Sequence, residues 1–494
     1  MAARRLSRRA WLTATTLPLI NLIAGCHGGE VVFGASDGAA VPDQTRTCTV
    51  VTSTEDAYWT TDVPAHEVTS DTVDVTVNEE AIAQIWEGFG GAFNERGWSY
   101  LTAAGLEDEA LLLLFGQDGC RFVSGRIPIG ANDYAMDRYT LDETPGDYEL
   151  EKFSIDRDRQ LLIPYVKAAL AVNPDIRLWA CPWTPPTWMK TIEETAPLPS
   201  PFDGGSMIDD DAILSTYAHY LTEFVLEYAA EGITIEVVSP QNDPSYEQSY
   251  PSCQWTPTLY AKFIGAYLGP TLEAAGVSTK VMLGTLSQKP TDLEFAASVG
   301  NDADAREYIG VAGLQWSMLD VVPTLKPYMV DLPLWQTEHK CGNYPWNPSG
   351  SPPYQPSAPN DHAYAVESWE LIRDWIKSGV NAYYAWNMVL DATGKGLDTH
   401  RDWAQNALLV VDGSRLVKTP TYYVFRHLSQ FVAPLARVLE SVGGDALAFE
   451  NPDGSTATVV YNRDTPRRFV VAVSGKKLAF DMPGNGWATV RCEP

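Results

Sequence analysis

Hydrophobic and polar positions follow two different rhythms along this chain. Between residues 86 and 432, short apolar runs of strand length alternate with longer stretches in which apolar residues recur every three or four positions. The second pattern is typical of amphipathic helices. It is clearest over 210–232, where one apolar stripe runs along the predicted helix and Gly232 provides a natural C-terminal stop. Further helices are predicted over 156–174 and 367–379.

The strand-like runs predict the architecture of this region. There are eight of them, at 86–93, 120–130, 175–183, 233–243, 280–286, 308–317, 332–339 and 380–390. Strands that alternate with helices pair in parallel through crossover connections, and eight such units close into a ring. The pattern therefore predicts an α/β fold, a (β/α)8 TIM barrel over 86–432.

The segments on either side of the barrel region favour strands instead. Residues 71–80 alternate valine with polar side chains, and the tail after residue 432 contains strand-like runs. Within that tail the motif NPDGS, at 451–455, is typical of a hairpin turn. Because the tail is too short to form a stable sandwich alone, we expect 55–85 and 433–494 to build one appended all-β sandwich together.

The first 26 residues have the features of a secretion signal: a basic start, a short apolar run and a small-residue end. SRRAWL at 7–12 resembles the twin-arginine export motif, and IAGC, which ends at Cys26, resembles a bacterial lipobox. The alternative is an ordinary cleaved signal in which Cys26 has no role. Residues 27–54 are rich in small and polar residues and are predicted to form a flexible tether. We expect an exported protein that is extracellular, periplasmic or lipid-anchored at the bacterial cell surface.

Charge narrows the classes of partner. The 494 residues include 35 basic and 63 acidic side chains, a formal net charge of −28. Such a balance disfavours nucleic acid and anionic membrane surfaces and leaves a neutral substrate as the better candidate. Contact with a membrane is expected only through a lipid anchor at Cys26. The sixteen Trp and 23 Tyr residues serve either as flat platforms for sugar rings or as core residues.

The cysteine count predicts disulfides. Without Cys26, six cysteines remain, an even number that fits disulfide pairing in an exported protein. Cys48 and Cys492, near the two chain ends, are expected to pair, and Cys253 and Cys341 form a second candidate pair. No two cysteines have the C-x-x-C spacing, so a structural zinc site is not expected.

Polar and aromatic residues follow most of the predicted strands, at the end where a TIM barrel places its active site. Taken singly, an Asp after a strand is more often a helix cap, and a lone Trp is more often a core residue. Glu338 is an exception, because a carboxylate at the end of so apolar a strand is costly without a task. Carboxylates, carboxamides and Trp rings together suit the binding of a neutral sugar and cleavage of its glycosidic bond by two carboxyl groups.

Seven stretches of the chain resemble glycoside hydrolase family 30, the family of glucosylceramidases and endo-β-1,6-glucanases. They are EGFGGAFNERG, RIPIGANDY, CPWTPPTWMK, VSPQNDP, WQTEHKCG, YYAWNMVLDATG and TPTYYVFRHLSQFV, and the similarity covers about residues 55–494. The resemblance implies a barrel fused to a β-sandwich and a glycosidase that retains anomeric configuration. The mechanism implied for it requires no metal and no organic cofactor.

The resemblance also implies residue roles. Glu338, after the seventh strand, matches the nucleophile. The family's acid/base is the Glu of an Asn-Glu-Pro triplet after the fourth strand, and Asp243 has that position here. Family members often have His or Tyr at the end of the sixth strand, where this chain has Gln315 and Trp316, which we expect to bind substrate. Further positions match residues that hold the sugar or lie near the nucleophile: Arg126, Asp133, Trp183, Asn242, Trp386 and Asn406.

Asp243 leaves three outcomes open. Asp is one methylene shorter than Glu, and a misplacement of about 1 Å can cost on the order of 100-fold in rate. Either Asp243 is the acid/base on a shifted loop, or Glu247 takes that role, or the protein is a weakened or inactive surface carbohydrate-binding protein. A barrel enzyme of another class, such as an aldolase, would need a strand-end lysine, and Lys190 and Lys340 lie just beyond the strands. The favoured prediction is hydrolysis of β-glycosidic bonds in a β-glucan or other neutral β-glycoside.

Overall fold

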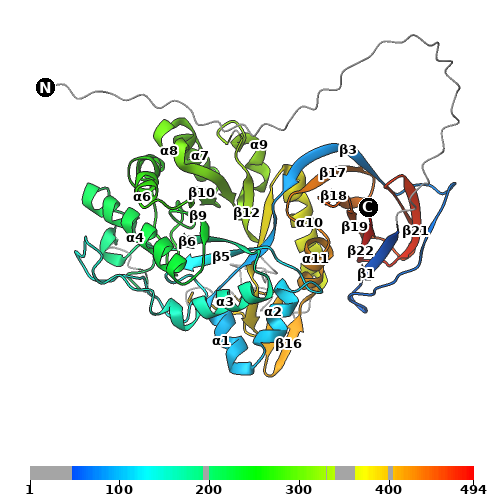
Figure 1. The fold of residues 1–494 in the computed structure, drawn as a ribbon, viewed down its shortest axis with the longest axis horizontal. Helices are drawn as coiled ribbons and strands as arrows, with labels where there is room; N and C mark the ends of the chain where they lie inside the picture. The colour runs from blue at the N-terminus through cyan, green and yellow to red at the C-terminus, as the bar shows by residue number, and fades with distance from the viewer. Residues whose placement is uncertain (1–46, 193–197, 199, 330, 340–361, 399–403) are drawn as a thin grey trace, which may run out of the picture. The chain divides into compact units, whose positions relative to one another are not determined.

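The computed structural model describes residues 47–192, 198, 200–329, 331–339, 362–398 and 404–494 (Figure 1). The predicted signal peptide, most of the predicted tether, Cys26, Lys340 and Cys341 lie outside these residues. Within the described part of the chain, no helix has both the length and the apolar character needed to span a membrane.

Eight parallel strands close into a barrel, which confirms the predicted fold class. Each strand lies inside one of the eight predicted segments: β4 (Gly88–Ala92), β5 (Ser124–Ile129), β6 (Arg177–Pro182), β9 (Ile235–Val238), β10 (Lys280–Leu286), β11 (Ile309–Leu314), β12 (Leu334–His339) and β13 (Ala382–Asn387). Closure is made by β13, which pairs in parallel with β4, and by β9, which pairs with both β6 and β10. The carboxyl ends of all eight strands therefore meet on one face of the barrel.

Helices surround the barrel strands (Figure 1). The longer ones are α1 (Glu95–Ala104), α2 (Glu107–Phe115), α3 (Leu162–Val172), α4 (Asp211–Ala230), α7 (Thr291–Asn301), α10 (His362–Ser378) and α11 (Pro420–Ser429); the shorter ones are α5 (Pro257–Phe263), α6 (Gly269–Ala274), α8 (Ala303–Tyr308) and α9 (Val322–Leu325).

Helix α4 shows how the sequence sets these elements. The Asp210 side chain accepts hydrogen bonds from the N–H groups of Ala212 and Ile213, which caps the first turn. The predicted apolar stripe is buried along its length, and Gly232 follows the helix with a φ of 81°. Helix α3, in contrast, begins later than predicted. Buried Asp158 accepts hydrogen bonds from two tyrosine hydroxyl groups and lies in a separate short 3-10 turn.

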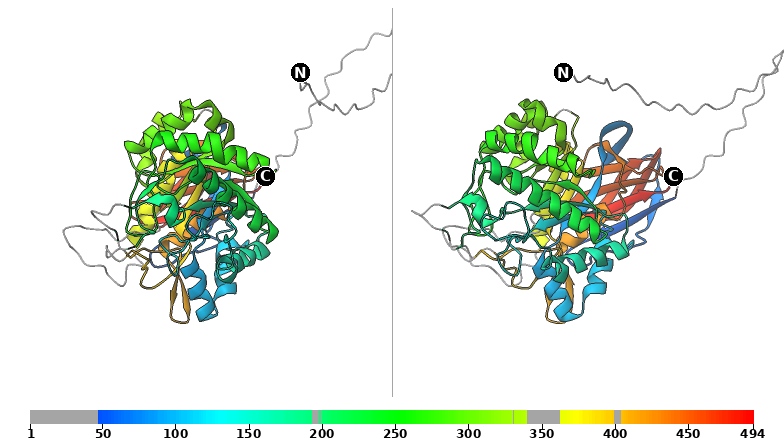
Figure 2. Two further views of the ribbon diagram at one scale, coloured as in Figure 1. Left: turned by 90° about the vertical axis from the view of Figure 1, so that its left-hand side faces the viewer. Right: turned by 60° about the vertical axis from the view of Figure 1, so that its left-hand side comes forward.

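A nine-stranded sheet accompanies the barrel and combines both ends of the chain (Figure 2). Its order is β1 (Cys48–Ser53), β22 (Gly486–Cys492), β19 (Thr456–Asn462), β18 (Asp445–Glu450), β17 (Ala436–Val442), β3 (Val75–Trp86), β20 (Arg467–Val473), β21 (Lys476–Met482) and β2 (Ala65–Glu67). This confirms the predicted β-sandwich from N- and C-terminal strands, and the NPDGS turn joins β18 to β19.

Strand β1 corrects the predicted start of the sandwich. It lies within 27–54, which the sequence assigned to the tether. The reason is its pairing with β22 over all six of its residues, together with a disulfide between Cys48 and Cys492. That disulfide confirms the predicted pairing of the chain ends.

The other described cysteines correct the expectation of further disulfides. Cys253 carries a free thiol, and Cys341, the partner predicted for it, lies outside the described residues. Cys120 and Cys181 are also buried and belong to no disulfide. A buried thiol behaves as a small apolar group, so an even count of cysteines did not by itself imply pairing.

Removing the Cys48–Cys492 disulfide is expected to lower the free energy of unfolding by about 2–5 kcal/mol, because the bond joins strands from opposite ends of the chain. Urea denaturation of wild type and of the Cys48→Ser/Cys492→Ser variant, each with and without reductant, measures this. Reductant should destabilise the wild type and leave the variant unchanged. Equal stability of the oxidised wild type and the variant would contradict the prediction.

Candidate active site

A cavity of about 190 Å³ lies at the carboxyl ends of the barrel strands. Of the three carboxyl groups that line it, two belong to the predicted catalytic pair: Glu338 on β12, and Asp243 in the loop that follows β9. Both are 6% exposed. The other lining residues are Asp133, Tyr246, Gln248, Tyr250, Gln288, Trp316, Trp386 and Gln405. Pockets for drug-sized ligands are larger, about 300–1,000 Å³.

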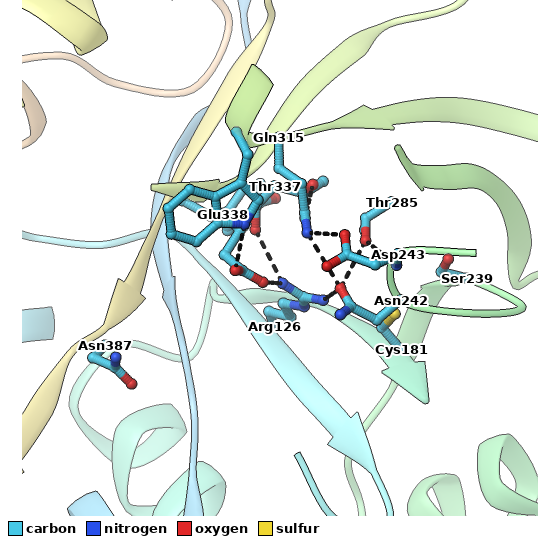
Figure 3. A network of polar contacts seen from close by, with 12 residues as sticks. Arg126, Cys181, Ser239, Asn242, Asp243, Thr285, Gln315, Thr337, Glu338 and Asn387 are labelled. Atoms are coloured by element: carbon cyan, nitrogen blue, oxygen red, sulfur yellow. Dashed lines mark hydrogen bonds and ion pairs between the residues drawn. The ribbon is translucent and has the colours of Figure 1, made fainter. Parts of the chain in front are cut away.

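Glu338 is held by two donors, one on each carboxylate oxygen (Figure 3). The Arg126 Nη1 group donates to Oε2 at 2.6 Å, and the Trp316 indole Nε1 donates to Oε1 at 2.8 Å. A charged donor and a ring N–H both favour the ionised carboxylate. Glu338 is thus fixed in orientation, with its negative charge opposite a buried positive one.

Arg126 joins the two carboxyl-bearing strand ends. This side chain on β5 is 0% exposed, and its Nη2 group donates to Asn242 Oδ1 at 2.7 Å. Its guanidinium carbon lies 4.3 Å from the centroid of the Trp183 ring and 5.4 Å from that of Trp386. Aromatic faces stabilise a cation that has lost its hydration. Arg126 therefore supports the cavity from behind rather than lining it.

Asp243 is held by a neutral group instead. Gln315 Nε2, from the end of β11, donates to Asp243 Oδ1 at 2.8 Å. The Thr337 hydroxyl donates to Gln315 Oε1 at 2.9 Å, which fixes the amide so that its NH2 group faces Asp243. Asp243 itself has a φ of 47°, a left-handed conformation that Asp adopts more readily than most residues.

These surroundings separate the two carboxyl groups in acidity. Burial, and then the charge of Glu338, raise the pKa of Asp243 to about 8. Burial also raises the pKa of Glu338, but Arg126 and Trp316 oppose that effect. We assign the shared negative charge to Glu338, because two donors face it, and the proton to Asp243. Since Gln315 donates to Oδ1, that proton resides on Oδ2.

The predicted site residues fall into two groups. Asp133, Trp316 and Trp386 line the cavity with the two carboxyl groups. The others stand behind it or beside it. Trp183 stacks on Trp386 with ring centroids 5.4 Å apart, while Arg126, Asn242 and Gln315 contact the carboxyl groups or one another. Asn406 is buried, but its neighbour Gln405 is the residue that lines the cavity.

Several functional candidates were missed at the sequence level. Gln248, Gln288 and Gln405 line the cavity from three different loops, and Thr337 orients Gln315. The only available signal was that Thr337 directly precedes Glu338 at a strand end. Loop glutamines carry no comparable pattern, because their convergence depends on how separate loops fold over the barrel.

The structure also places the residues named as alternatives. Glu247 is exposed and accepts a hydrogen bond from the Gly205 N–H at 3.1 Å, and it does not line the cavity. The buried Lys190 ammonium donates to three backbone carbonyl groups, so it is not presented to the cavity as a nucleophilic amine. Among the described residues, no cluster of three or more His, Cys, Asp or Glu side chains is arranged to hold a metal ion.

Comparisons with known proteins agree with this architecture. The Glycosyl hydrolase family 30 TIM-barrel domain matches residues 86–432, and the Glycosyl hydrolase family 30 beta sandwich domain matches 440–490. Lysosomal acid glucosylceramidase of Mus musculus is 27% identical over 79% of this chain and 77% of its own. Endo-1,6-beta-D-glucanase BGN16.3 of Trichoderma harzianum is 24% identical over 75% and 74%. The crystal structure of SrfJ from Salmonella typhimurium is 23% identical, covers 91% of this chain and all of its own, and has a TM-score of 0.79.

Breaking the buried ion pair from the Arg126 side is expected to be costly. Arg126→Met should lower the free energy of unfolding at pH 7 by about 3–5 kcal/mol, because Glu338 is left buried and charged without its partner. Glu338→Gln in the same chain should restore most of the loss. Urea denaturation of wild type, the two single variants and the double variant forms a double-mutant cycle, which measures the interaction free energy of the pair.

The loss should also depend on pH. In Arg126→Met the pKa of Glu338 remains above its ordinary value. Below the pKa of Glu338 in the unfolded chain, the buried side chain is neutral and the variant keeps its free energy of unfolding. That free energy falls as pH rises through the pKa of Glu338 in the folded protein, because the buried side chain then becomes charged. The single variant should therefore recover towards pH 4. An equal loss at pH 4 and pH 7 would contradict this assignment of charge.

Proposed function

This chain belongs to glycosyl hydrolase family 30 and is a glycoside hydrolase, and from that premise we propose that it cleaves β-glucosidic bonds with retention of configuration. Glu338 is the proposed nucleophile and Asp243 the proposed acid/base. Glucosylceramides and β-1,6-linked glucans are the candidate substrates, because relatives of both descriptions match most of the chain.

The observation that carries the proposal is the unequal treatment of two carboxyl groups in one cavity. Glu338 receives a guanidinium and an indole N–H, whereas Asp243 receives a neutral amide and has a pKa raised to about 8. Cleavage of a glycosidic bond with retention needs an ionised nucleophile and a protonated acid at the same time. Pairs of carboxyl groups whose surroundings separate their pKa values are a mark of such acid and base assignments.

The proposed reaction has two displacements. In the first, a Glu338 oxygen attacks the anomeric carbon while the bond to the leaving oxygen breaks, and Asp243 Oδ2 gives its proton to that oxygen. In the second, the oxygen of a water molecule bonds to the anomeric carbon while the bond from that carbon to the Glu338 oxygen breaks; the ionised Asp243 takes the proton of this water, and Glu338 leaves as a carboxylate. Arg126 and Trp316 hold Glu338 in position through both steps.

The remaining lining residues support a neutral sugar as ligand. Trp386 offers a flat apolar ring, Asp133 a carboxyl group, and the loop glutamines offer neutral donors and acceptors. No lysine or arginine lines the described part of the cavity, as expected for a substrate without negative charge. The proposal includes export and a lipid anchor at Cys26, which would present the enzyme to glycans outside the cell.

Substitution of the two carboxyl groups tests the proposal. With an aryl β-glucoside, Glu338→Gln should abolish turnover, and Asp243→Asn should lower kcat/KM by about 10²- to 10⁴-fold. The Asp243→Asn loss should shrink as the leaving group becomes more acidic, because such a group departs without a proton. Asp243→Glu is the conservative comparison and should keep part of the activity.

Two results would contradict the assignments. If Asp243→Asn matches wild type while Glu338→Gln is inactive, Asp243 is not the acid. If wild type binds glucan but hydrolyses no glycoside of the panel, the chain is a binding protein. The anomer first released, read by proton NMR, must be β; an α product would exclude retention.

The pH dependence of kcat/KM is expected to be bell-shaped. On the basic side, kcat/KM should fall as pH rises through about 8, because Asp243 loses the proton it must donate. On the acidic side it should fall as Glu338 becomes protonated, at a pKa above its ordinary value. In Asp243→Asn, assayed with an acidic leaving group, the basic limb should disappear; its persistence near pH 8 would assign that limb to another group.

A further inference from the structure

We infer that Gln405 is a sugar-binding residue whose Nε2 group is held as a hydrogen-bond donor to a substrate hydroxyl oxygen. The inference rests on the proposed glycosidase function and concerns the same cavity. Gln405 is 5% exposed and lines the cavity together with Trp386 and the two carboxyl groups.

The orientation of Gln405 begins at the first turn of helix α1. The N–H of Gly97 donates to Asn94 Oδ1 at 2.7 Å, and Asn94 is the N-cap of that helix. A backbone N–H can only donate, so the Asn94 oxygen is the atom that faces it. The Asn94 Nδ2 group is thereby directed to the other side.

Two further carboxamides continue the chain of hydrogen bonds. Asn94 Nδ2 donates to Asn387 Oδ1 at 3.3 Å, and Asn387 Nδ2 donates to Gln405 Oε1 at 3.1 Å. Asn94 is 1% exposed and Asn387 is 0% exposed, so water does not replace these contacts. Figure 3 shows Asn387 on the barrel wall apart from the charged network around Arg126. Each amide is oriented by the one before it, and Gln405 is left with Nε2 as its free end.

The backbone of Gln405 is held as well. Its N–H donates to the carbonyl of Gly394 at 2.9 Å. Gly394 has a φ of 61°, and a Cβ built there would approach the Gln405 carbonyl oxygen to 2.1 Å. Only glycine permits this close contact between the two loops.

The chemistry of the free end defines its ligand. Among the described residues, no partner of the Gln405 Nε2 group is found, and the side chain borders the cavity. A fixed NH2 group requires an acceptor, and a sugar hydroxyl oxygen is the acceptor that a glycoside brings. A polar group built to bond one hydroxyl discriminates against a substrate that lacks it, because the protein donor is then left unpaired.

Deoxy substrates test this assignment. Wild type, Gln405→Met and Gln405→Glu are assayed with an aryl β-glucoside and with its 2-, 3-, 4- and 6-deoxy analogues. Gln405→Met is expected to lower kcat/KM for the parent glucoside about 2- to 12-fold. For one deoxy analogue the ratio of wild type to variant should fall to about 1, because the hydroxyl that Gln405 bonds is already missing. Gln405→Glu keeps the acceptor for Asn387 but removes the donor, so it should show the same dependence on that analogue.

Melting temperatures of the three proteins identify any loss of folding. If wild type is active and the ratio to Gln405→Met is the same for all five substrates, Gln405 has only a structural role and the inference is overturned. If wild type hydrolyses none of the five, the proposed function fails, and the inference fails with it. A ratio that falls for a single analogue supports both.

Discussion

The buried ion pair between Arg126 and Glu338 is the constraint on which the site depends. Removing both charges from water is expensive, and their attraction repays that cost only with good geometry and further hydrogen bonds. Three kinds of contact serve this purpose. The Trp rings face the guanidinium, the Asn242 side-chain oxygen accepts a hydrogen bond from its Nη2 group, and the Trp316 indole N–H donates to the second carboxylate oxygen of Glu338. A barrel strand end gives such a cluster rigid support, because each partner comes from a different strand or the loop that follows it.

The same ion pair also affects the pKa of Asp243. Burial is the largest cause of the raised pKa of Asp243, and the negative charge of Glu338 adds to it. Arg126 opposes this rise, and a second cation beside Asp243 would lower the pKa further and favour loss of the proton that the reaction needs. Gln315 stands where the resemblance led us to expect His or Tyr, and its amide orients Asp243 without adding charge. The left-handed backbone at Asp243 turns the chain at the residue whose side chain faces Gln315, at the end of β11.

The sequence was informative where a pattern repeats or a segment is unusual. The eight barrel strands follow from periodicity, and the position of Glu338 follows from a carboxylate on an apolar strand. Other features depend on contacts that no local pattern records. Helix α3 is shorter than predicted, because Asp158 accepts hydrogen bonds from two tyrosines that are distant in the sequence. Residues 48–53 form a strand rather than a tether, because they pair with β22. The sequence led us to expect that Gln315 binds substrate. The fold shows instead that Thr337 orients the Gln315 amide towards Asp243, a contact that no local pattern records.

The catalytic pair and Gln405 are therefore positioned on different principles. On the catalytic side, charge is concentrated and compensated by Arg126. Near Gln405, a donor is oriented through three neutral carboxamides that start from a helix N-cap. Positioning by neutral groups has a specific advantage here. Any cation used to bind the sugar would act on Asp243 and Glu338 through the low dielectric of the site and shift the acidities that separate them. A relay of amides specifies a hydroxyl group while it leaves the proton on Asp243.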